Sequence, residues 1–597
     1  MAILDHSAQP KFLRVSVWLI GLAWTVPFLQ PYHRFPLTAF YSEWLALALG
    51  LAAAAPLIAR EPWRDGKVPL VAAAPLGLAV VLALQVALGR VPYAEQALAG
   101  GLYLLWAALI IALGCELGRR LALDSIATRL AWFLLAGGII HALIGLAQHY
   151  EISTPLDFLI ARRSGMGMHG NLGQPNHYAA GVTLALASAA YLYGVGQLNV
   201  AMAATCAVLF LAVLALAGAR STWLYLAALA ALSLLLHRRQ RDGTSRRVAV
   251  FTCGLLPGFV AADWLVTLPF LIPGEGLQTT SMQRLFQIAS GVRPRLELWG
   301  EAWRMFLAAP VLGAGFGQFA WHHFLYQATA GAPGGAGLFN HSHNVVLQLL
   351  AETGIAGTLI VTGPLLAWLA GLRRVNFDPA WWWLSSLLAV IGIHSLLEYP
   401  LWYAYFLGPA ALLLGLGAQH AISVRLPNAA RAVVALALLA GGVNLAAVIS
   451  AYRDFERLVF GAGPQSGQAA TDQEFAKALM RVHGEPLLRP YVELAIAYGV
   501  RVEPAQLRDK LELVTRTMHF APVEVVVVRR ALLLALAGQA DAAREQLGRS
   551  LRAYPAERAA IVAELKDRAL LYPSAMTPLL ELATSKIADR RDSPEGK

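Results

Sequence analysis

The stretch 199-NVAMAATCAVLFLAVLALAGARSTWLYLAALAALSLLLHRR-239 decides the fold of this chain. It holds two uninterrupted apolar runs, 199–217 and 221–237, joined only by Gly218, Ala219 and Arg220. A helix needs about 20 mostly apolar residues to cross the hydrocarbon core of a bilayer, and each run is close to that length. The stretch therefore predicts two neighbouring transmembrane helices with a sharp turn between them.

Similar runs cover most of the chain outward from this pair. Of the 597 residues, 57% are apolar and 14% are charged, whereas about 25% of a soluble domain is charged. This composition excludes a soluble enzyme, a disordered chain and a DNA-binding protein. The predicted fold class is an all-α polytopic membrane protein with about 13 transmembrane helices. We expect them at 12–29, 43–59, 68–88, 98–116, 130–148, 177–195, 199–217, 221–237, 249–271, 344–371, 381–396, 401–420 and 431–450.

Basic residues indicate the orientation of these helices. Clusters such as Arg60/Arg64, Arg119/Arg120 and the five arginines of 238–247 flank alternate ends of the runs, and positive residues prefer cytoplasmic loops. The net charge of +11 is therefore attributed to these loops and to contact with anionic lipid, not to nucleic acid. This orientation places a large loop, 273–343, on the side of the membrane opposite the cytoplasm. With an odd number of spans, the tail lies there too.

The chain divides into three predicted regions: N-terminal transmembrane helices over 1–160, a membrane core over 161–450 and a C-terminal tail over 451–597. Charged residues return in the tail. Residues 531–547 predict two helices around a Gly turn, followed by Tyr554-Pro555. Small residues at a helix crossing followed by Tyr-Pro are typical of tetratricopeptide-like pairs, although a generic helical bundle explains a single unit as well.

Polar residues at the edge of a membrane are costly and become functional candidates. A Gly-rich loop runs from Arg162-Arg163 through Gln174-Pro175-Asn176-His177, and Arg220 begins the eighth span. The loop alone could be a turn that satisfies its own backbone. A lone Arg could extend to the membrane surface or bind a phosphate through its guanidinium fork.

The large loop carries a second group of candidates. Arg293 to Phe306, which includes Arg295, predicts an amphipathic helix whose aromatic residues Trp299, Trp303 and Phe306 face lipid. The following Gly313-Ala-Gly315-Phe-Gly317 is read as a turn, because no strand precedes it and the Lys of a nucleotide loop is missing.

The stretch Asn340-His341-Ser342-His343-Asn344 opens the tenth span. Its histidines could bind a metal together with His322 and His323, lie at the interface for structural reasons, or perform acid–base chemistry. Glu352 lies two turns inside that span. The hairpin from His394 to Phe406 contains Glu398, Tyr399, Tyr403 and Tyr405, and an aromatic belt at the interface explains its tyrosines but not Glu398.

These motifs, in this order, resemble the bacterial O-oligosaccharyltransferases of the PglL type, within the superfamily of O-antigen ligases and polymerases. The resemblance covers about residues 160–420: GQPNH at 173–177, the Arg-Ser at 220–221, the R-x-x-x-W stretch at 295–299, HSHN at 341–344 and EYPLWYAYF at 398–406. It implies a glycosyltransferase of the bacterial inner membrane, with its active site on the periplasmic face. Such an enzyme transfers a glycan en bloc from polyprenyl (undecaprenyl) diphosphate to Ser or Thr of periplasmic or pilin-like proteins.

The expected chemistry assigns roles to nine residues. A weakly nucleophilic hydroxyl needs a base, and we predict His343 in that role, with Asn344 close enough to orient it and His341 pointing elsewhere. Arg220 and Arg295, which lack acidic neighbours in sequence, are expected to bind the diphosphate. The predicted substrate-binding residues are Gln174, Asn176, His177, Asn344, Glu398 and Tyr405. No metal, nucleotide or other cofactor is expected.

Three alternatives remain at the level of the sequence. An O-antigen ligase would transfer the same donor to lipid A core, but ligases generally lack a large helical tail. A transporter of lipid-linked oligosaccharide predicts broken helices and charges at the midplane, whereas the polar residues here gather at one interface. A structural membrane protein with an adaptor tail predicts that none of the arginines matter.

Overall fold

The computed structural model describes residues 11–59, 67–161, 168–268, 293–330, 337–423, 427–460 and 472–585. Most of this part of the chain is helical, and its one sheet is the antiparallel pair β1 (Lys67–Pro69) and β2 (Ala421–Ser423). Several residues noted in the sequence lie outside these ranges, namely Arg60, Arg64, Arg162, Arg163 and the whole stretch 269–292.

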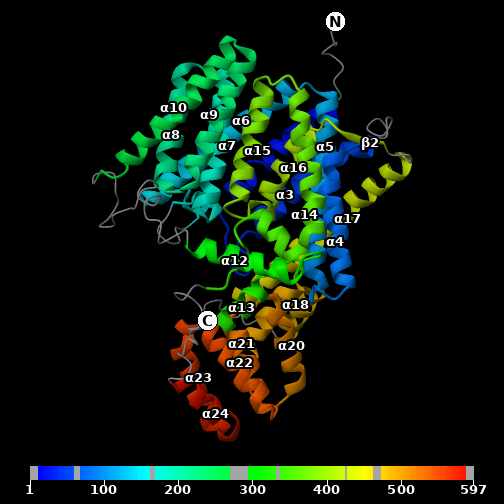
Figure 1. Cartoon of the computed structure of the whole chain (residues 1–597), viewed down its shortest axis with the longest axis vertical. Helices are drawn as coiled ribbons and strands as arrows, with labels where there is room; N and C mark the ends of the chain where they lie inside the picture. The colour runs from blue at the N-terminus through cyan, green and yellow to red at the C-terminus, as the bar shows by residue number, and fades with distance from the viewer. Residues whose placement is uncertain are drawn as a thin grey trace, which may run out of the picture.

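The apolar runs form one helical bundle (Figure 1). Its helices are α1 (Lys11–Ala23), α2 (Val26–Leu29), α3 (Phe40–Ala54), α4 (Ala73–Ala87), α5 (Ala94–Arg120), α6 (Leu123–His149), α7 (Pro175–Gly194), α8 (Val200–Ala217), α9 (Ser221–Gln240), α10 (Gly243–Leu265), α14 (Val345–Gly371), α15 (Pro379–Ser395), α16 (Ala404–Leu416) and α17 (Pro427–Phe460). The expected turn between two spans is confirmed at Gly218, which ends α8 with a left-handed φ of 63°.

Ten of the described helical segments are long and apolar enough to cross a membrane, against the 13 expected. The three other expected spans, 177–195, 381–396 and 401–420, correspond to α7, α15 and α16. Helix α15 has 17 residues. Helix α16 has only 13, because the short 3-10 turn Pro400–Trp402 takes up the start of the span expected at 401–420. Counting apolar residues overlooked this break.

Helix α7 fails the same criterion although it has 20 residues. It packs against α6, α8, α9, α10 and α15, and most of its side chains are buried. A helix enclosed by other helices can carry polar groups that lipid would reject. Thr183, Ser188 and His177 are buried along it. The multi-pass character of the chain is thus confirmed.

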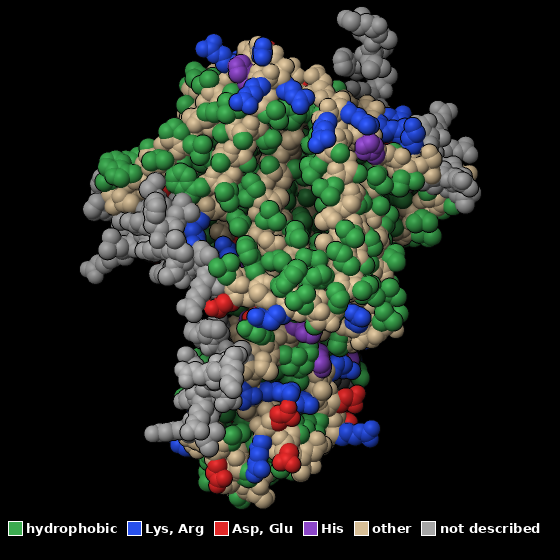
Figure 2. All heavy atoms as spheres, viewed as in Figure 1, with side chains coloured by type: hydrophobic (Ala, Val, Ile, Leu, Met, Phe, Trp, Pro, Cys, Tyr) green, Lys and Arg blue, Asp and Glu red, His purple; other side chains and the backbone are tan. Residues whose placement is uncertain are grey.

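The two ends of the bundle differ in chemistry. Lys and Arg side chains gather at the end where the N-terminus lies (Figure 2). At the opposite end lie α12 (Arg293–Ala308), α13 (Phe319–Ala330) and the C-terminal helices, as Figure 1 shows. We refer to this as the site end.

The described residues of the C-terminal helical region form seven α-helices, which include the predicted helix pair. They are α18 (Asp472–Gly484), α19 (Arg489–Gly499), α20 (Leu507–Phe520), α21 (Glu524–Leu536), α22 (Ala540–Ala553), α23 (Arg558–Leu571) and α24 (Pro573–Thr584). The predicted pair is α21 and α22, joined at Gly538 with a φ of 75°. Ala531, Ala543 and Leu547 form the packed crossing of this pair.

The large loop contributes to the core of this C-terminal region. Phe324 and Ala328 of α13 pack with Val514, Val526 and Leu533 in one buried cluster. Polar contacts also join the region to the start of α5: Arg489 lies 2.6 Å from Glu95, and the Tyr93 hydroxyl donates to Glu493 at 2.6 Å. The bundle and the C-terminal helices are therefore one interlocked structure.

Helix α12 packs differently from the expectation. It is amphipathic, but Leu298, Ala302 and Met305 form its buried stripe, against Phe319 and against Ala351 of α14. Trp303 is exposed, as an interface helix requires, whereas Trp299 is half-buried. This packing fixes the direction in which α12 presents Arg295.

The turn at 313–317 is confirmed, and it fills a break in α14. Gly354 interrupts that helix with φ 64° and ψ −166°. The freed carbonyls of Ala351 and Glu352 accept from the N–H groups of Ala314 and Gly315 at 2.9 and 3.1 Å. A Cβ on Gly313 would lie 2.2 Å from the Glu352 backbone, so glycine is required there.

Candidate active site

A buried carboxylate organises the site end of the bundle. Glu398 follows α15, and its side chain is 4% exposed. Four side chains from distant parts of the chain donate hydrogen bonds to its two oxygens. They are Arg295 at 2.7 Å and Asn176 at 2.8 Å to Oε1, and His343 at 2.8 Å and Gln174 at 3.3 Å to Oε2. Sequence reasoning found all five residues but not their common centre.

These contacts keep Glu398 ionised. Burial raises the pKa of its carboxyl, but the hydrogen bond from His343 and the positive charge of Arg295 outweigh burial, so the pKa lies below its ordinary value. An anion buried with a guanidinium and three further donors is well satisfied. The site therefore holds a permanent negative charge beside an imidazole.

His343 is positioned by a backbone turn and by Glu398. It adopts a left-handed φ of 56° just before α14, a conformation uncommon outside glycine. Because Glu398 accepts from Nδ1, the proton resides there and Nε2 keeps its lone pair. The His343 side chain is 18% exposed, so Nε2 can be reached. This is the geometry of an oriented general base.

The expected orienting role of Asn344 is not what the structure shows. Its side chain caps α14 by accepting from the N–H groups of Val346 and Leu347, both at 3.1 Å, and donates to Leu396 at 3.3 Å. Helix α14 begins after His343, so the two histidines precede the helix. Their hydrogen bonds differ, since Nδ1 of His343 meets Glu398 and Nδ1 of His341 meets Asn340, but both rings contact Tyr399.

The two arginines reach the site end from different elements. Arg295 was expected to lack an acidic partner, yet it pairs with Glu398, which is 103 residues away in sequence. Arg220 is half-buried at the start of α9. One turn further on, the Tyr225 hydroxyl meets Nδ1 of His394 at 3.0 Å, and the backbone carbonyl of His394 accepts from the Glu398 N–H at 2.8 Å. The start of α9 thus adjoins the segment that carries Glu398.

His177 and Tyr405 lie beneath the carboxylate. Nδ1 of His177 lies 3.2 Å from Nε2 of His394, and its ring packs edge-on against Tyr399 and Tyr403. Tyr405 is 3% exposed and packs against Phe28 and Tyr403. Neither residue contacts Glu398 directly. Together with Tyr399 and Tyr403 they form a layer of packed rings, which we call the aromatic floor of the site.

Gln174 has an unused acceptor. Its Nε2 donates to Glu398, whereas its Oε1 is buried and has no hydrogen-bond partner in the described chain. A buried acceptor without a donor is costly unless a ligand supplies one. The position beside His343 and Glu398 makes this oxygen a candidate contact for a substrate hydroxyl.

A second Glu–His pair, which the sequence did not reveal, lies nearby between α12 and α13. Nδ1 of His323 is 2.6 Å from Glu301, and Nε2 of the same ring accepts from Gln327 at 2.8 Å. All three side chains are buried. His322 and His323, considered above as metal ligands, are thus held apart from His343, and the described residues contain no group of three potential ligands.

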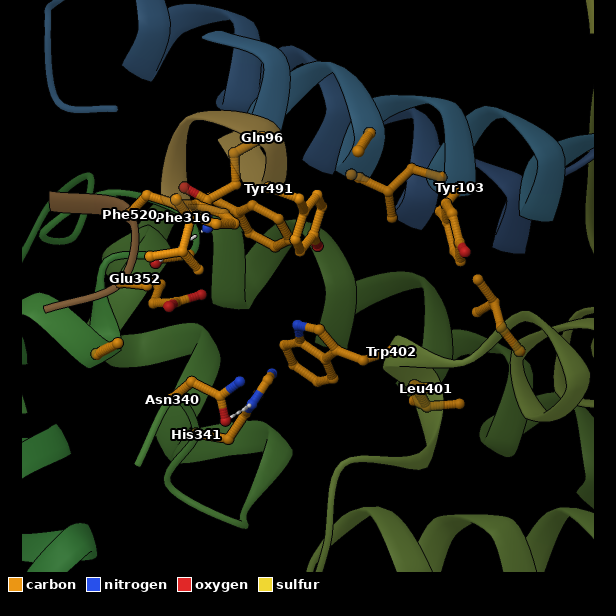
Figure 3. A pocket seen from close by; sticks show the side chains of 18 of the residues that line it. Gln96, Tyr103, Phe316, Asn340, His341, Glu352, Leu401, Trp402, Tyr491 and Phe520 are labelled. Carbon is orange, nitrogen blue, oxygen red and sulfur yellow. Dashed lines mark hydrogen bonds between the residues drawn. The ribbon is translucent and has the colours of Figure 1, made fainter. Parts of the chain in front are cut away.

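A large apolar cavity adjoins the site on the side of α4, α5, α14, α16 and α17. It measures about 1530 Å³. His341 lies at its edge, stacked on Tyr399 with ring centroids 4.3 Å apart, and Tyr399 in turn lies 5.3 Å from His343. Figure 3 shows His341, Trp402 and Glu352 directed into the cavity. Burial and the nearby His343 lower the pKa of His341 to about 3.

Comparison with known proteins shows which families the chain resembles. A family model described as O-antigen ligase matches residues 205–362, and one described as virulence factor membrane-bound polymerase, C-terminal, matches residues 382–567. The chain is 27% identical to the general O-oligosaccharyltransferase of Acinetobacter baylyi over 68% of its length and 69% of the relative's. It is 26% identical to the ComP-specific O-oligosaccharyltransferase of the same organism, over 49% of its length and 51% of the relative's.

The chain is therefore a multi-pass membrane protein, part of which matches a family model described as O-antigen ligase. It is similar to two O-oligosaccharyltransferases, in line with the resemblance that the motifs indicated. The enzyme class expected from the sequence, a glycosyltransferase, is confirmed by these relatives.

Proposed function

We propose that this chain transfers a glycan en bloc from a polyprenyl diphosphate carrier, undecaprenyl diphosphate in particular, to a Ser or Thr hydroxyl of a periplasmic or pilin-like protein. One observation carries the proposal: Glu398 brings together His343 and Arg295, a base and a cation, at one end of a membrane bundle. The names of the two relatives support the choice of reaction.

His343 acts as the general base in this proposal. Its Nε2 takes the proton of the acceptor hydroxyl while the hydroxyl oxygen bonds to the anomeric carbon of the glycan. The bond between that carbon and the diphosphate oxygen breaks, and the electron pair leaves with the diphosphate. Glu398 holds the Nδ1–H and stabilises the imidazolium that forms.

Arg295 and Arg220 receive the negative charge of the leaving group. A guanidinium has five N–H donors, so Arg295 can keep its bond to Glu398 and still bind a phosphate oxygen. Arg220 approaches from the start of α9, at the same end of the bundle. Because diphosphate is a stable anion, two cations and one base suffice. The reaction as proposed uses no metal, nucleotide or other cofactor.

Five further residues shape the pocket. Gln174 offers its unpartnered Oε1 to a sugar or acceptor hydroxyl, and Asn176 fixes Glu398 from the opposite side. His177 and Tyr405 hold the aromatic floor, and Asn344 anchors the start of α14 under His343. Truncating Gln174 should reduce transfer without reducing the amount of protein in the membrane.

We place the protein in the bacterial inner membrane with the site on the periplasmic face. Lys and Arg gather at the end of the bundle opposite the site, and positive loops favour the cytoplasm. Lipid-linked glycan in the outer leaflet, an acceptor protein and membrane lipid are then the partners. The C-terminal helices lie on the acceptor side.

The test is purified protein in lipid with lipid-linked oligosaccharide and a candidate acceptor, read by intact mass. A glycan-sized gain on the acceptor, lost in His343→Ala, supports the proposal. His323→Ala is the matched control, because it removes a His of the buried pair and should leave transfer per folded molecule near wild type. Absence of glycan on any protein would overturn it.

Transfer to lipid A core is the second candidate, favoured by the O-antigen ligase match over 205–362. The same assay separates the two, since a ligase would modify lipid A core and leave protein unchanged. Neither outcome arises from a transporter, which forms no new glycosidic bond.

A further inference from the structure

The cavity beside the site lacks the positive charge that Arg295 and Arg220 give to the other part of the site. Arg295 and Arg220 belong to α12 and α9, and neither lines the cavity. Among the described residues that line it there is no Lys or Arg, and its one carboxyl is Glu352. A diphosphate needs cations to leave water. The cavity therefore does not suit the charged end of the donor.

The cavity is lined partly by transmembrane helices and partly by the C-terminal helical region. Leu78, Ala107 and Leu414 line it within the transmembrane helices. Tyr491, Ile496 and Tyr498 of α19 line it within the C-terminal region, where Ile496 is 36% and Tyr498 43% exposed. Lipid chains remain in the hydrocarbon core. An occupant that contacts both parts is apolar inside the membrane and continues beyond it, as a helix can and a lipid chain cannot.

The third observation is the distance to the base. His341 borders the cavity and stacks on Tyr399, whose ring is 5.3 Å from that of His343. Contacts thus lead from His343 through Glu398 to Arg295, and from His343 through Tyr399 and His341 to the cavity. A group transfer needs donor and acceptor on opposite sides of the reacting bond.

We propose that this cavity binds the apolar membrane-inserted helix of the acceptor protein and presents the residues just beyond the membrane to His343. The inference rests on the proposed function and deepens it, because it assigns the acceptor to membrane-anchored proteins. The polyprenyl chain of the glycan donor then lies on the side of the site formed by α9 and α12.

The test compares two forms of one acceptor: the full protein with its apolar N-terminal helix, and the same protein without that helix. Ala99 lines the cavity from α5, and Ala99→Trp fills it. Leu98→Trp is the matched control, because Leu98 is the preceding residue of the same helix, is 46% exposed and does not line the cavity.

We expect Ala99→Trp to lower kcat/KM for the anchored acceptor at least about tenfold, since a linked second contact contributes that much or more. Transfer to the helix-free acceptor should stay at the wild-type value, which also shows that the variant is folded. Leu98→Trp should change neither. Equal losses on both acceptors with a higher KM for the donor would assign the cavity to the polyprenyl chain. If Ala99→Trp left kcat/KM for the anchored acceptor unchanged, the proposal would be overturned as well.

A second measurement does not depend on turnover. A photoreactive benzoylphenylalanine at Ile496 should cross-link the anchored acceptor, and the same group at Leu224 of α9, 51% exposed, should not. Cross-linking of labelled polyprenyl diphosphate at Ile496 would overturn the assignment. If wild-type protein forms no glycoprotein while Ile496 still captures the anchored helix, the proposed reaction fails and the docking site stands.

Discussion

Two Glu–His pairs in the described part of the chain have nearly the same geometry and different surroundings. In one, His343 lies 2.8 Å from Glu398, and in the other, His323 lies 2.6 Å from Glu301. The His323 side chain is 3% exposed and its second nitrogen is taken by Gln327, whereas His343 is 18% exposed. The pair itself does not make a catalytic site. A reachable Nε2 and a neighbouring cation distinguish the one at Glu398.

The largest expected effect is that of His343→Ala. Removing a general base lowers the rate by about 10²–10⁴-fold. Donor binding should persist, because the arginines remain. Single-turnover transfer and binding of lipid-linked donor should be measured on the same preparation. Near wild-type transfer would remove His343 from the mechanism, and activity abolished by chelators and restored by added metal would favour metal chemistry instead.

Arg295→Ala should come next. A charge-assisted hydrogen bond contributes about 1.5–3 kcal/mol, which corresponds to roughly 10- to 150-fold in kcat/KM. Arg295→Lys should recover only part of this loss, because Lys cannot form the planar fork. Arg220→Ala is expected in the same range. Wild-type kcat/KM in both alanine variants would refute the assignment of the diphosphate site.

Glu301→Gln tests the other pair. It weakens a buried charge-assisted hydrogen bond, so we expect the free energy of unfolding to fall by about 1.5–3 kcal/mol. Transfer per folded molecule should change less than about threefold, well under the effect of a missing general base. Thermal unfolding and turnover, measured together, check this. A large fall in turnover with unchanged stability would mean that the second pair takes part in the reaction.

His341→Phe should have the smallest effect and concerns pH. Burial and His343 hold the pKa of His341 at about 3, so it is neutral above about pH 4. The pKa of Glu398 lies below its ordinary value. Because His341 stays neutral, His341→Phe should leave the dependence of transfer on pH unchanged between pH 5 and 8. A profile that moved would give His341 a titrating role.

The sequence predicted where the helices are better than it predicted which of them are surrounded by protein instead of lipid. Every apolar run that it marked is a helix, but α7, α15 and α16 do not satisfy a span criterion, because burial within protein removes the need for length and apolarity. Glu398 was marked because an aromatic belt does not explain a carboxylate. That it gathers Gln174, Asn176, Arg295 and His343 depends on contacts up to 224 residues apart, which spacing along a single chain does not encode.

Other features were beyond reach for a similar reason. The role of Asn344 as a helix cap depends on where α14 begins, one residue later than expected. The Glu301–His323 pair requires α12 and α13 to lie together, and nothing in either helix alone indicates this. The cavity is shaped by helices that are far apart in the sequence, from α4 and α5 to α19. Such features are consequences of packing, not of local pattern.

The position of α13 has a practical consequence for dissecting the protein. Because Phe324 and Ala328 lie in the core formed by Val514, Val526 and Leu533, the C-terminal region is discontinuous in sequence. A fragment that starts after α17 lacks part of its own core and exposes an apolar groove to water. A truncation before α18 leaves α13 with an apolar face in the remaining membrane protein. Expression of either half alone should therefore yield aggregation-prone protein. A fusion of 319–330 to 472–585 restores the part of the core that α13 supplies.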